Sequence, residues 1–464
     1  MIKDWLARVF FVCSAFVCST SYAVNLIEVY QQALSSDPAY QQAFAQKLSN
    51  QEGVPINLAG LLPSLSATVA PFASTSLQSG PARVGSDSQQ GYNIALTLTQ
   101  VLFDFGQLSG YRGAKRTSEQ SDAAFNQATQ DLMMRVSKTY FSILEDTDNL
   151  RYIEATRDVY AKQLDQVKQQ FQVGLKTITD VYTAEASYQS AIADYIAAQN
   201  QLANDKENLR AMTGQLYPSF AYLRDDFPLV KPVPANEEAW VETSAKQNWG
   251  VKAAQLGAEA ARQKIKQQFA GHLPTVNLQG QYTINYARNS NGEFGVTPNG
   301  SAQSHTSVVT LNVTVPLVQG GLVVAETNQA KYNYQVAAQL FEKNLREALN
   351  LTRQSYLGVI LGISKINADK QAIKSSMSSY EGMEAGYRVG TEILVNVLDQ
   401  RQKVVQAQQQ YASDRYAYVN HLLSLKQAAG TLSPNDLLAI NSWLEETSDQ
   451  PAKKIGLQSK KTKA

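Results

Sequence analysis

Histidine and cysteine are the side chains that most often carry catalysis or bind metal, and this sequence gathers neither into a usable cluster. Its three histidines, His272, His305 and His421, fall on separate segments. Both cysteines, Cys13 and Cys18, lie within the first 23 residues. The sequence has no His-x-x-x-His pair, no Gly-rich loop before Lys-Ser or Lys-Thr, and no Gly-x-Ser-x-Gly turn. We therefore expect no enzymatic activity, no cofactor and no metal site.

The first 23 residues have the pattern of a secretory signal peptide. Lys3 and Arg8 form a basic start, residues 9–17 are apolar, and Ser-Tyr-Ala at 21–23 offers small residues for cleavage. The apolar run is too short to span a bilayer, so we expect export and a mature chain from residue 24. Lipidation of Cys18 is the alternative, but the bulky valine before it argues against a lipoprotein signal.

The charge of the remaining chain excludes a global attraction to polyanions. Without Lys3, Asp4 and Arg8, 39 basic and 39 acidic side chains remain. A neutral balance supplies no general field for nucleic acid, so we expect no nucleic-acid partner. No mature stretch approaches 18 consecutive apolar residues, which argues against a transmembrane helix.

The chain contains one unit twice, at a spacing of about 211 to 216 residues. The two copies also share a stretch of 39 residues without Gly or Pro, which is followed by a glycine in each copy. The matching segments are 62–65 with 273–276, 96–103 with 311–318, 171–174 with 387–390, and 175–213 with 391–429. We expect each copy to hold a helical lead-in (around 25–52 and 236–268), two strands and two long helices.

Long helices packed along their length are predicted after the strands of each copy. Residues 114–173 lack Gly and Pro and would span roughly 90 Å as one helix. Apolar residues then recur at strict sevens, a pattern that predicts coiled-coil-like packing. These positions are Val181, Tyr188, Tyr195, Leu202 and Leu209 in the first copy and Val397, Val404, Tyr411, Tyr418 and Leu425 in the second. An ordinary coiled coil or a spectrin-like bundle would fit the helices equally well.

The predicted strands favour a membrane β-barrel. Apolar and uncharged polar residues alternate over 92–99, 276–286 and 308–315, and more weakly over 65–69, where Pro71 limits the strand. Residues 91–103 and 275–287 carry no charge, as is typical of barrel strands. Four strands cannot close a barrel, and lipid does not tolerate an open sheet edge. The chain should therefore oligomerise; a trimer would give twelve strands and room for a pore, whereas a dimer would give eight and a filled interior.

The sequence resembles the TolC family of outer-membrane channel proteins over nearly the whole mature chain. Matching segments recur in order at both repeat positions: 27–33, 62–63, 100–104, 173–175 and 178–181 in the first copy, and 271–275, 319–321, 383–387, 389–391 and 397–399 in the second. The resemblance implies a mainly α homotrimer with a twelve-stranded β-barrel in lipid and a long α-helical barrel in the periplasm. It also implies drug, small-molecule or protein export with a periplasmic adaptor and an inner-membrane RND or ABC transporter.

On this resemblance, the domains are the signal peptide (1–23), repeat 1 (24–225), repeat 2 (226–432) and a C-terminal segment (433–464). The last comprises part of a small girdle and a disordered basic tail. A periplasmic adaptor or a surface-exposed trimeric coiled-coil protein is the rival reading. Adaptors carry one helical hairpin between soluble β-domains, whereas this chain has two pairs of apolar-faced strands.

The resemblance also implies a gate at the periplasmic end. Tyr387 corresponds to the gate tyrosine, and Thr179 and Asp180 to its partners on the neighbouring helix pair. The gate arginine position is Glu392 here, and a carboxylate cannot donate charge-assisted hydrogen bonds to Thr179 and Asp180. The closed state should therefore be weaker, or held by other residues.

A ring of carboxylates is expected at the entrance. Asp399 corresponds to one of two aspartates that narrow it, whereas the second position is Asn396 here. Three copies of Asp399 around an axis would attract cations. The alternative is that Asp399 is an ordinary solvated carboxylate beside the heptad; its counterpart in the first copy is Thr183.

Overall fold

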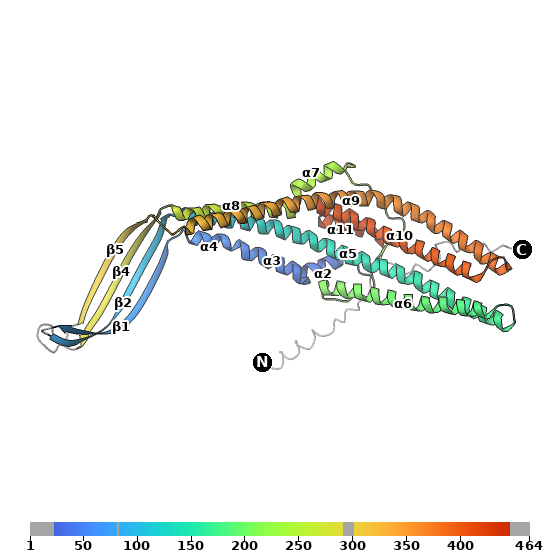
Figure 1. The fold of residues 1–464 in the computed structure, drawn as a ribbon, viewed down its shortest axis with the longest axis horizontal. Helices are drawn as coiled ribbons and strands as arrows, with labels where there is room; N and C mark the ends of the chain where they lie inside the picture. Colours follow the sequence, from blue (N-terminus) through green and yellow to red (C-terminus); the bar gives the residue numbers. More distant parts are fainter. Residues whose placement is uncertain (1–22, 81–82, 291–300, 446–464) are drawn as a thin grey trace, which may run out of the picture. The chain divides into compact units, whose positions relative to one another are not determined.

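The computed structural model describes residues 23–80, 83–290 and 301–445. The predicted signal peptide, apart from residue 23, and the predicted basic tail lie outside these residues. Figure 1 shows two sets of elements in the same order, as the internal repeat predicts. The first set is α2 (Leu26–Ser36), α3 (Pro38–Gln51), α4 (Gly53–Ala59), β1 (Ser64–Gly80), β2 (Arg83–Phe103), α5 (Phe105–Gln172) and α6 (Ile178–Thr213).

The second set begins after a short strand, β3 (Tyr222–Leu223). It comprises α7 (Glu237–Gln247), α8 (Trp249–Phe269), the 3₁₀ turn η1 (Ala270–His272), β4 (Thr275–Ser290), β5 (Ser301–Thr314), α9 (Leu322–Val389) and α10 (Leu394–Ala428). α11 (Pro434–Asn441) and β6 (Leu444–Glu445) follow. α5 and α9 each contain 68 residues, or roughly 100 Å of helix.

The chain divides into two compact units, each built from both repeats. Among the described residues, one unit comprises 23–42, 126–248 and 347–445, and the other comprises those within 43–125 and 249–346. The second unit holds the four long strands. The first holds the ends of the long helices that carry the predicted gate residues.

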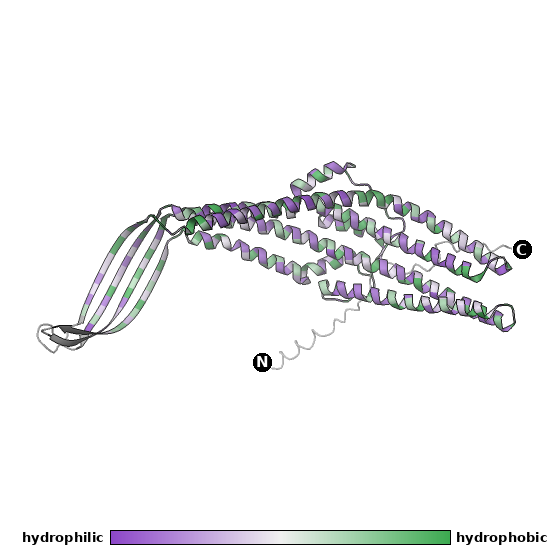
Figure 2. Cartoon of the chain, viewed as in Figure 1, coloured by the Kyte–Doolittle hydropathy of each residue, from purple (hydrophilic) through white to green (hydrophobic). Residues whose placement is uncertain are grey.

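The four long strands form one antiparallel sheet in the order β1-β2-β4-β5. The register places the predicted apolar residues on one face, because Leu65, Leu98 and Val309 lie in one cross-strand row with Gly280. Leu65 is 65% and Val309 is 77% exposed. Figure 2 shows hydropathy alternating along these strands. The sheet therefore presents an apolar face that nothing in the described chain covers.

The prediction that Pro71 limits the first strand is wrong. β1 continues through Pro71, which pairs with Tyr92, as far as Gly80. β1 lies at the edge of the sheet, where one side of the strand makes no ladder bonds. Within one chain, proline is tolerated there because its missing N–H costs no hydrogen bond inside the sheet.

The first unit has a large apolar core contributed by α2, α5, α6, α9, α10 and α11. All five heptad residues of the second copy, Val397 to Leu425, are at most 8% exposed. In the first copy Val181 and Leu209 are buried, whereas Tyr195 is half-buried. The seven-residue repeat therefore marks the packed side of α10 fully and that of α6 in part.

Within the described residues, no helix has both the length and the apolarity needed to cross a membrane.

A buried arginine fastens the segment between the repeats to α10. The Arg415 guanidinium is 4% exposed and donates to the carbonyl oxygens of Leu223 and Arg224, each at 2.8 Å. It also pairs with Asp225 at 3.0 Å. β3 lies in this segment and pairs with β6, so the C-terminal part of the described chain is tied to the same place.

Candidate functional site

The predicted gate residues lie where the two long helix pairs turn. Gly174 lies in the turn after α5 and has a φ of +77°. Gly390 lies in the turn after α9 and has a φ of +83°. Glycine reaches this left-handed region without a Cβ penalty. The N–H of Leu175 donates to Gln170 O at 2.9 Å, and the N–H of Thr391 donates to Gly386 O at 2.9 Å. Both copies therefore close their helical hairpins in the same way.

A small apolar cluster, called here the end cluster, joins the two hairpins. It draws residues from α5, α6 and α10, and Tyr387 of α9 packs against it. Its buried members are Tyr160, Leu164, Val167, Val181, Ala184, Ala191, Leu394 and Leu398. The chain thus brings Tyr387 against the α5–α6 hairpin through apolar packing.

Tyr387 makes its polar contact with a residue that the sequence did not single out. The Lys176 Nζ lies 4.3 Å from the centroid of the Tyr387 ring. The Tyr387 hydroxyl is buried and has no hydrogen-bond partner among the described residues. An ammonium over an aromatic face is attracted by the ring quadrupole, so Lys176 supplies a cation between the hairpins.

The carboxylate of Asp180 makes its hydrogen bonds within its own helix, at the N-terminal cap of α6. Its carboxylate accepts hydrogen bonds from Thr177 N at 3.0 Å and from Thr177 Oγ1 at 2.8 Å, while its N–H donates to Thr177 Oγ1 at 3.2 Å. This capping box satisfies free donors at the start of α6. Thr179 is exposed in the same turn. Within one chain, the described hydrogen bonds do not link Asp180 to Tyr387.

Asn396 and Glu392, the two residues that depart from the family pattern, are hydrogen-bonded to each other. Asn396 Nδ2 donates to Glu392 Oε2 at 2.9 Å. The side chain of Glu392 also lies against the last turn of α9, since a Cβ added at Gly386 would stand 2.9 Å from Glu392 Cγ. Glu392 is therefore held over its own hairpin turn.

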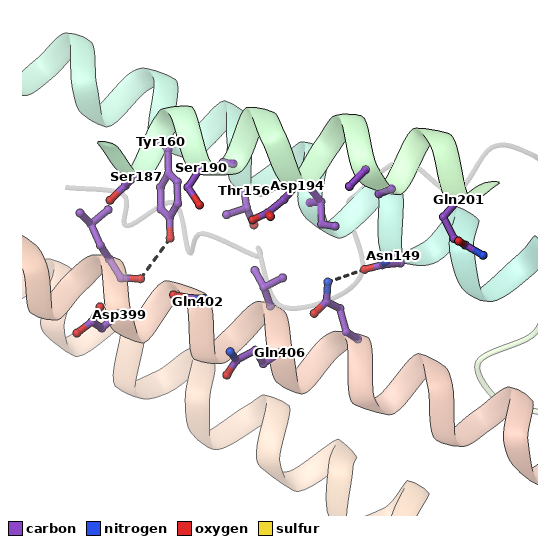
Figure 3. A pocket seen from close by; sticks show the side chains of 17 residues that line it. Asn149, Thr156, Tyr160, Ser187, Ser190, Asp194, Gln201, Asp399, Gln402 and Gln406 are labelled. Atoms are coloured by element: carbon purple, nitrogen blue, oxygen red, sulfur yellow. Dashed lines mark hydrogen bonds between the residues drawn. The ribbon is translucent and has the colours of Figure 1, made fainter. Parts of the chain in front are cut away.

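Asp399 is exposed and lines a pocket of about 640 Å³ between α5, α6 and α10 (Figure 3). Asp194 and several glutamines share this pocket. The Tyr160 hydroxyl at its wall donates to Leu398 O at 3.3 Å. Burial raises the pKa of Tyr160, with Asp399 and Asp194 adding to the rise and Arg401 opposing it. The lining is polar and acidic, and it holds no nucleophile with an adjacent base.

Two pairs of aspartates lie further along the hairpins. Burial, together with the neighbouring Asp205, raises the pKa of Asp146 to about 6. Burial and then Asp414 raise the pKa of Asp369 to about 6. Each pair joins the two helices of one hairpin, so each repeat carries one acidic contact inside a helix–helix interface.

These pairs and Lys176 escaped the sequence reasoning. Each pair joins positions far apart in the chain, and the register that aligns them follows from the hairpin geometry. Lys176 did leave a signal: it is a cation in the turn that faces Tyr387, in a sequence whose gate arginine position is acidic. Within the described residues, no group of three or more His, Cys, Asp or Glu side chains could hold a metal ion.

The sequence model of the family described as "Outer membrane efflux protein" matches residues 29–215 and 240–431, one segment in each repeat. The chain is 35% identical to Outer membrane protein TolC of Salmonella enteritidis, covering 91% of this chain and 85% of that protein. It is 25% identical to Proteases secretion protein PrtF of Dickeya chrysanthemi, over 92% of each chain.

The fold matches solved channel structures as well. The CmeC outer membrane channel of Campylobacter jejuni aligns with a TM-score of 0.74 at 18% identity, over 91% of this chain and 90% of that one. The mainly helical fold with four strands per chain is therefore confirmed as that of a TolC-like channel. With a family match across both repeats, the chain belongs to the outer membrane efflux protein family and is a non-enzymatic efflux and secretion channel of the Gram-negative outer membrane.

Proposed function

We propose that three copies of this chain form one channel, with a twelve-stranded barrel in the outer membrane and the long helices in the periplasm. The observation that carries this proposal is the sheet, which has two open edges and an exposed apolar face. Lipid satisfies neither edge, so β5 of one copy must pair with β1 of the next. Three sheets of four strands close the ring.

Purification in detergent tests this assembly. The protein should have the mass of a trimer and should form pores in planar lipid bilayers. A stable monomer that stays in solution without detergent would overturn the proposal. Cysteine pairs offer a sharper test: one cysteine placed in β1 and one in β5 should form a disulfide between copies and not within one copy.

The ends of the hairpins form the periplasmic entrance in this proposal. Lys176 against Tyr387 holds the two hairpins of each copy together, and Glu392 with Asn396 braces the α9–α10 turn. Asp399 is exposed beside these contacts and contributes one carboxylate per copy to a ring that attracts cations. Thr179 and Asp180 lie at the start of α6, where a neighbouring copy can reach them.

The entrance ring has its own experiment. Asp399→Ala should weaken block of the pore by multivalent cations added on the periplasmic side, while Asn396→Asp should strengthen it by adding a second ring. Asp165→Ala, an exposed aspartate on α5, is the matched control. Unchanged block in Asp399→Ala would remove Asp399 from the entrance and leave the channel itself in place.

The partners in this proposal are a periplasmic adaptor and an inner-membrane transporter of the RND or ABC class. Both kinds of export have support, since the matching family is described as an outer membrane efflux protein and one relative is named as a protease secretion protein. Deleting the gene should raise drug sensitivity, reduce secreted protein, or do both, and the pattern identifies the transporter class. Unchanged drug sensitivity together with unchanged secretion would contradict a role in export.

A further inference from the structure

The outward face of the sheet carries a single charged side chain among the strand side chains that the structure describes: Arg288 of β4. In β4 the residues on this face are the even-numbered ones, because Gly280, Tyr282 and Ile284 share rows with Leu98, Leu96 and Ile94 of β2. Arg288 continues the same series. Its side chain is exposed and has no ion pair or hydrogen bond among the described residues.

The position of Arg288 matches the edge of a membrane. The apolar series in β4 runs from Val276 to Tyr286, which is ten residue steps. At about 3.3 Å per residue the series covers roughly 33 Å along the strand. A barrel strand tilted by about 40° converts this length to about 25 Å of height, the thickness of the apolar band of outer-membrane barrels. Arg288 therefore stands one step beyond the band, at the level of the lipid headgroups.

A stacked pair of tyrosines lies next to this position, as is common at a membrane interface. Tyr92 and Tyr286 stack with their ring centroids 5.1 Å apart. A hollow of about 360 Å³ is lined by this stack, by Gln90 and by Arg288, and also by Phe72 of the edge strand β1, which shares a row with Gly91 on the other face of the sheet. Tyrosine favours the headgroup level because its ring is apolar and its hydroxyl is polar.

Gly91 allows a close approach of β2 and β4 next to the hollow. A Cβ at Gly91 would stand 2.0 Å from the Tyr286 carbonyl oxygen and 2.9 Å from the tip of the Phe72 ring. Only glycine lets the two strands and the ring approach this closely.

Polar groups deeper in the apolar face are already satisfied. His305 lies in the same row as Ile284, and its Nδ1 shares a hydrogen bond of 3.0 Å with the Tyr282 hydroxyl. Lipid tails could not satisfy either group, and the pair makes this unnecessary. Arg288 differs from this pair: among the described side chains of this face, it is charged and has no partner of opposite sign.

The strand connections assign the leaflet. β4 starts next to α8 and η1, and β5 ends before α9, so the Val276 end of the sheet faces the long helices. Arg288 lies toward the opposite end. With the helices in the periplasm, as in the proposed function on which this inference rests, Arg288 reaches the outer leaflet.

We propose that Arg288 and the hollow beside the Tyr92–Tyr286 stack bind the phosphate of an outer-leaflet lipid, one lipid for each copy of the chain. The guanidinium pairs with phosphate oxygens, which it can meet with two parallel N–H donors. The Gln90 amide lies in the same hollow and offers further donors. The lipid tails cover the apolar face below, including Leu96 and Leu98.

Native mass spectrometry of the detergent-solubilised protein, titrated with diphosphorylated lipid A, tests this site. The wild type should retain up to three lipid molecules per trimer. Arg288→Gln should weaken retention about fivefold, which corresponds to about 1 kcal/mol for one basic side chain at a membrane surface. Arg288→Lys should keep most of the retention. Arg346→Gln, an exposed arginine on α9 paired with Glu342, should behave as the wild type.

Further arms separate the possible failures. Dephosphorylated lipid A should bind the wild type no better than it binds Arg288→Gln, and millimolar inorganic phosphate should not displace the bound lipid. Equal retention of diphosphorylated lipid A by the wild type and Arg288→Gln would overturn the inference, as would full displacement by inorganic phosphate. Arg288→Gln should still form pores in planar bilayers, because the lipid site is separate from the pore. If the wild type itself forms no pores, the proposed channel assembly is wrong, whatever the result for lipid binding.

Discussion

Replacing Lys176 should open the periplasmic entrance. Lys176 Nζ lies 4.3 Å from the centre of the Tyr387 ring, and this contact spans the two hairpins of one copy. A cation–π contact contributes about 0.5–1 kcal/mol when exposed and about 2 kcal/mol when desolvated. Lys176 is half-buried, so about 1 kcal/mol per copy is a fair value. If the three copies add, Lys176→Gln shifts the closed–open equilibrium by about 3 kcal/mol, or roughly a hundredfold.

Single-channel recording in planar bilayers measures this shift as open probability and mean conductance. Tyr387→Leu should give the same increase, and the double variant should give no further increase, because both substitutions remove one contact. Tyr387→Phe should stay closed, since it keeps the ring and loses a hydroxyl that has no hydrogen-bond partner among the described residues. Lys168→Gln, at an exposed site on α5, is the matched control.

Two outcomes would refute this reasoning. Unchanged gating in Lys176→Gln would show that the contact does not hold the entrance closed. Opening by Tyr387→Phe to the same extent as by Tyr387→Leu would show that the hydroxyl carries the closure through another copy, as the family pattern with Asp180 implies.

Other consequences of the structure can be measured directly. The pKa of Asp146 is raised from 3.8 to about 6, so its contribution to stability is present below pH 3.8 and is lost as the pH rises through 6. Asp146→Asn should therefore raise the thermal stability of the assembled protein at pH 8 and flatten the pH dependence of that stability. The control Asp165→Asn should change neither. Gly91→Ala should reduce the assembled fraction in membranes because its Cβ meets a backbone oxygen at 2.0 Å, whereas Gly280→Ala, with its nearest contact at 4.0 Å, should assemble normally. Arg415→Met leaves two carbonyl oxygens without their donor and should cost about 3 kcal/mol or more in the free energy of unfolding, measured by denaturant titration; an unchanged midpoint would show that water replaces the guanidinium.

Much of the fold could be predicted because its signals are periodic. The seven-residue repeat from Val397 to Leu425 identifies residues that are all buried in α10. The two-residue alternation identifies the face on which Leu65, Leu98 and Val309 share a row. Both patterns follow from geometry that repeats along an element, so the sequence alone displays them.

The features that escaped prediction depend on the arrangement of elements. A proline interrupts a central strand but is tolerated in an edge strand, and only the strand order shows that β1, which contains Pro71, is at the edge within one chain. Lys176 gains its role from the end cluster, which places Tyr387 of one hairpin beside the turn of the other. Likewise, Asp146 and Asp205 meet only through the register of two helices, which no local pattern specifies.

Because the sheet has two open edges, each newly exported chain must assemble before it aggregates. Until β1 and β5 find neighbours, their outer backbone groups can pair with any exposed strand, so the unassembled chain is prone to aggregation. Assembly of three copies depends steeply on their concentration, whereas misdirected pairing needs only one wrong collision. Slow delivery of chains to the membrane therefore prolongs the vulnerable interval, and the yield of channels should fall faster than the supply of chains.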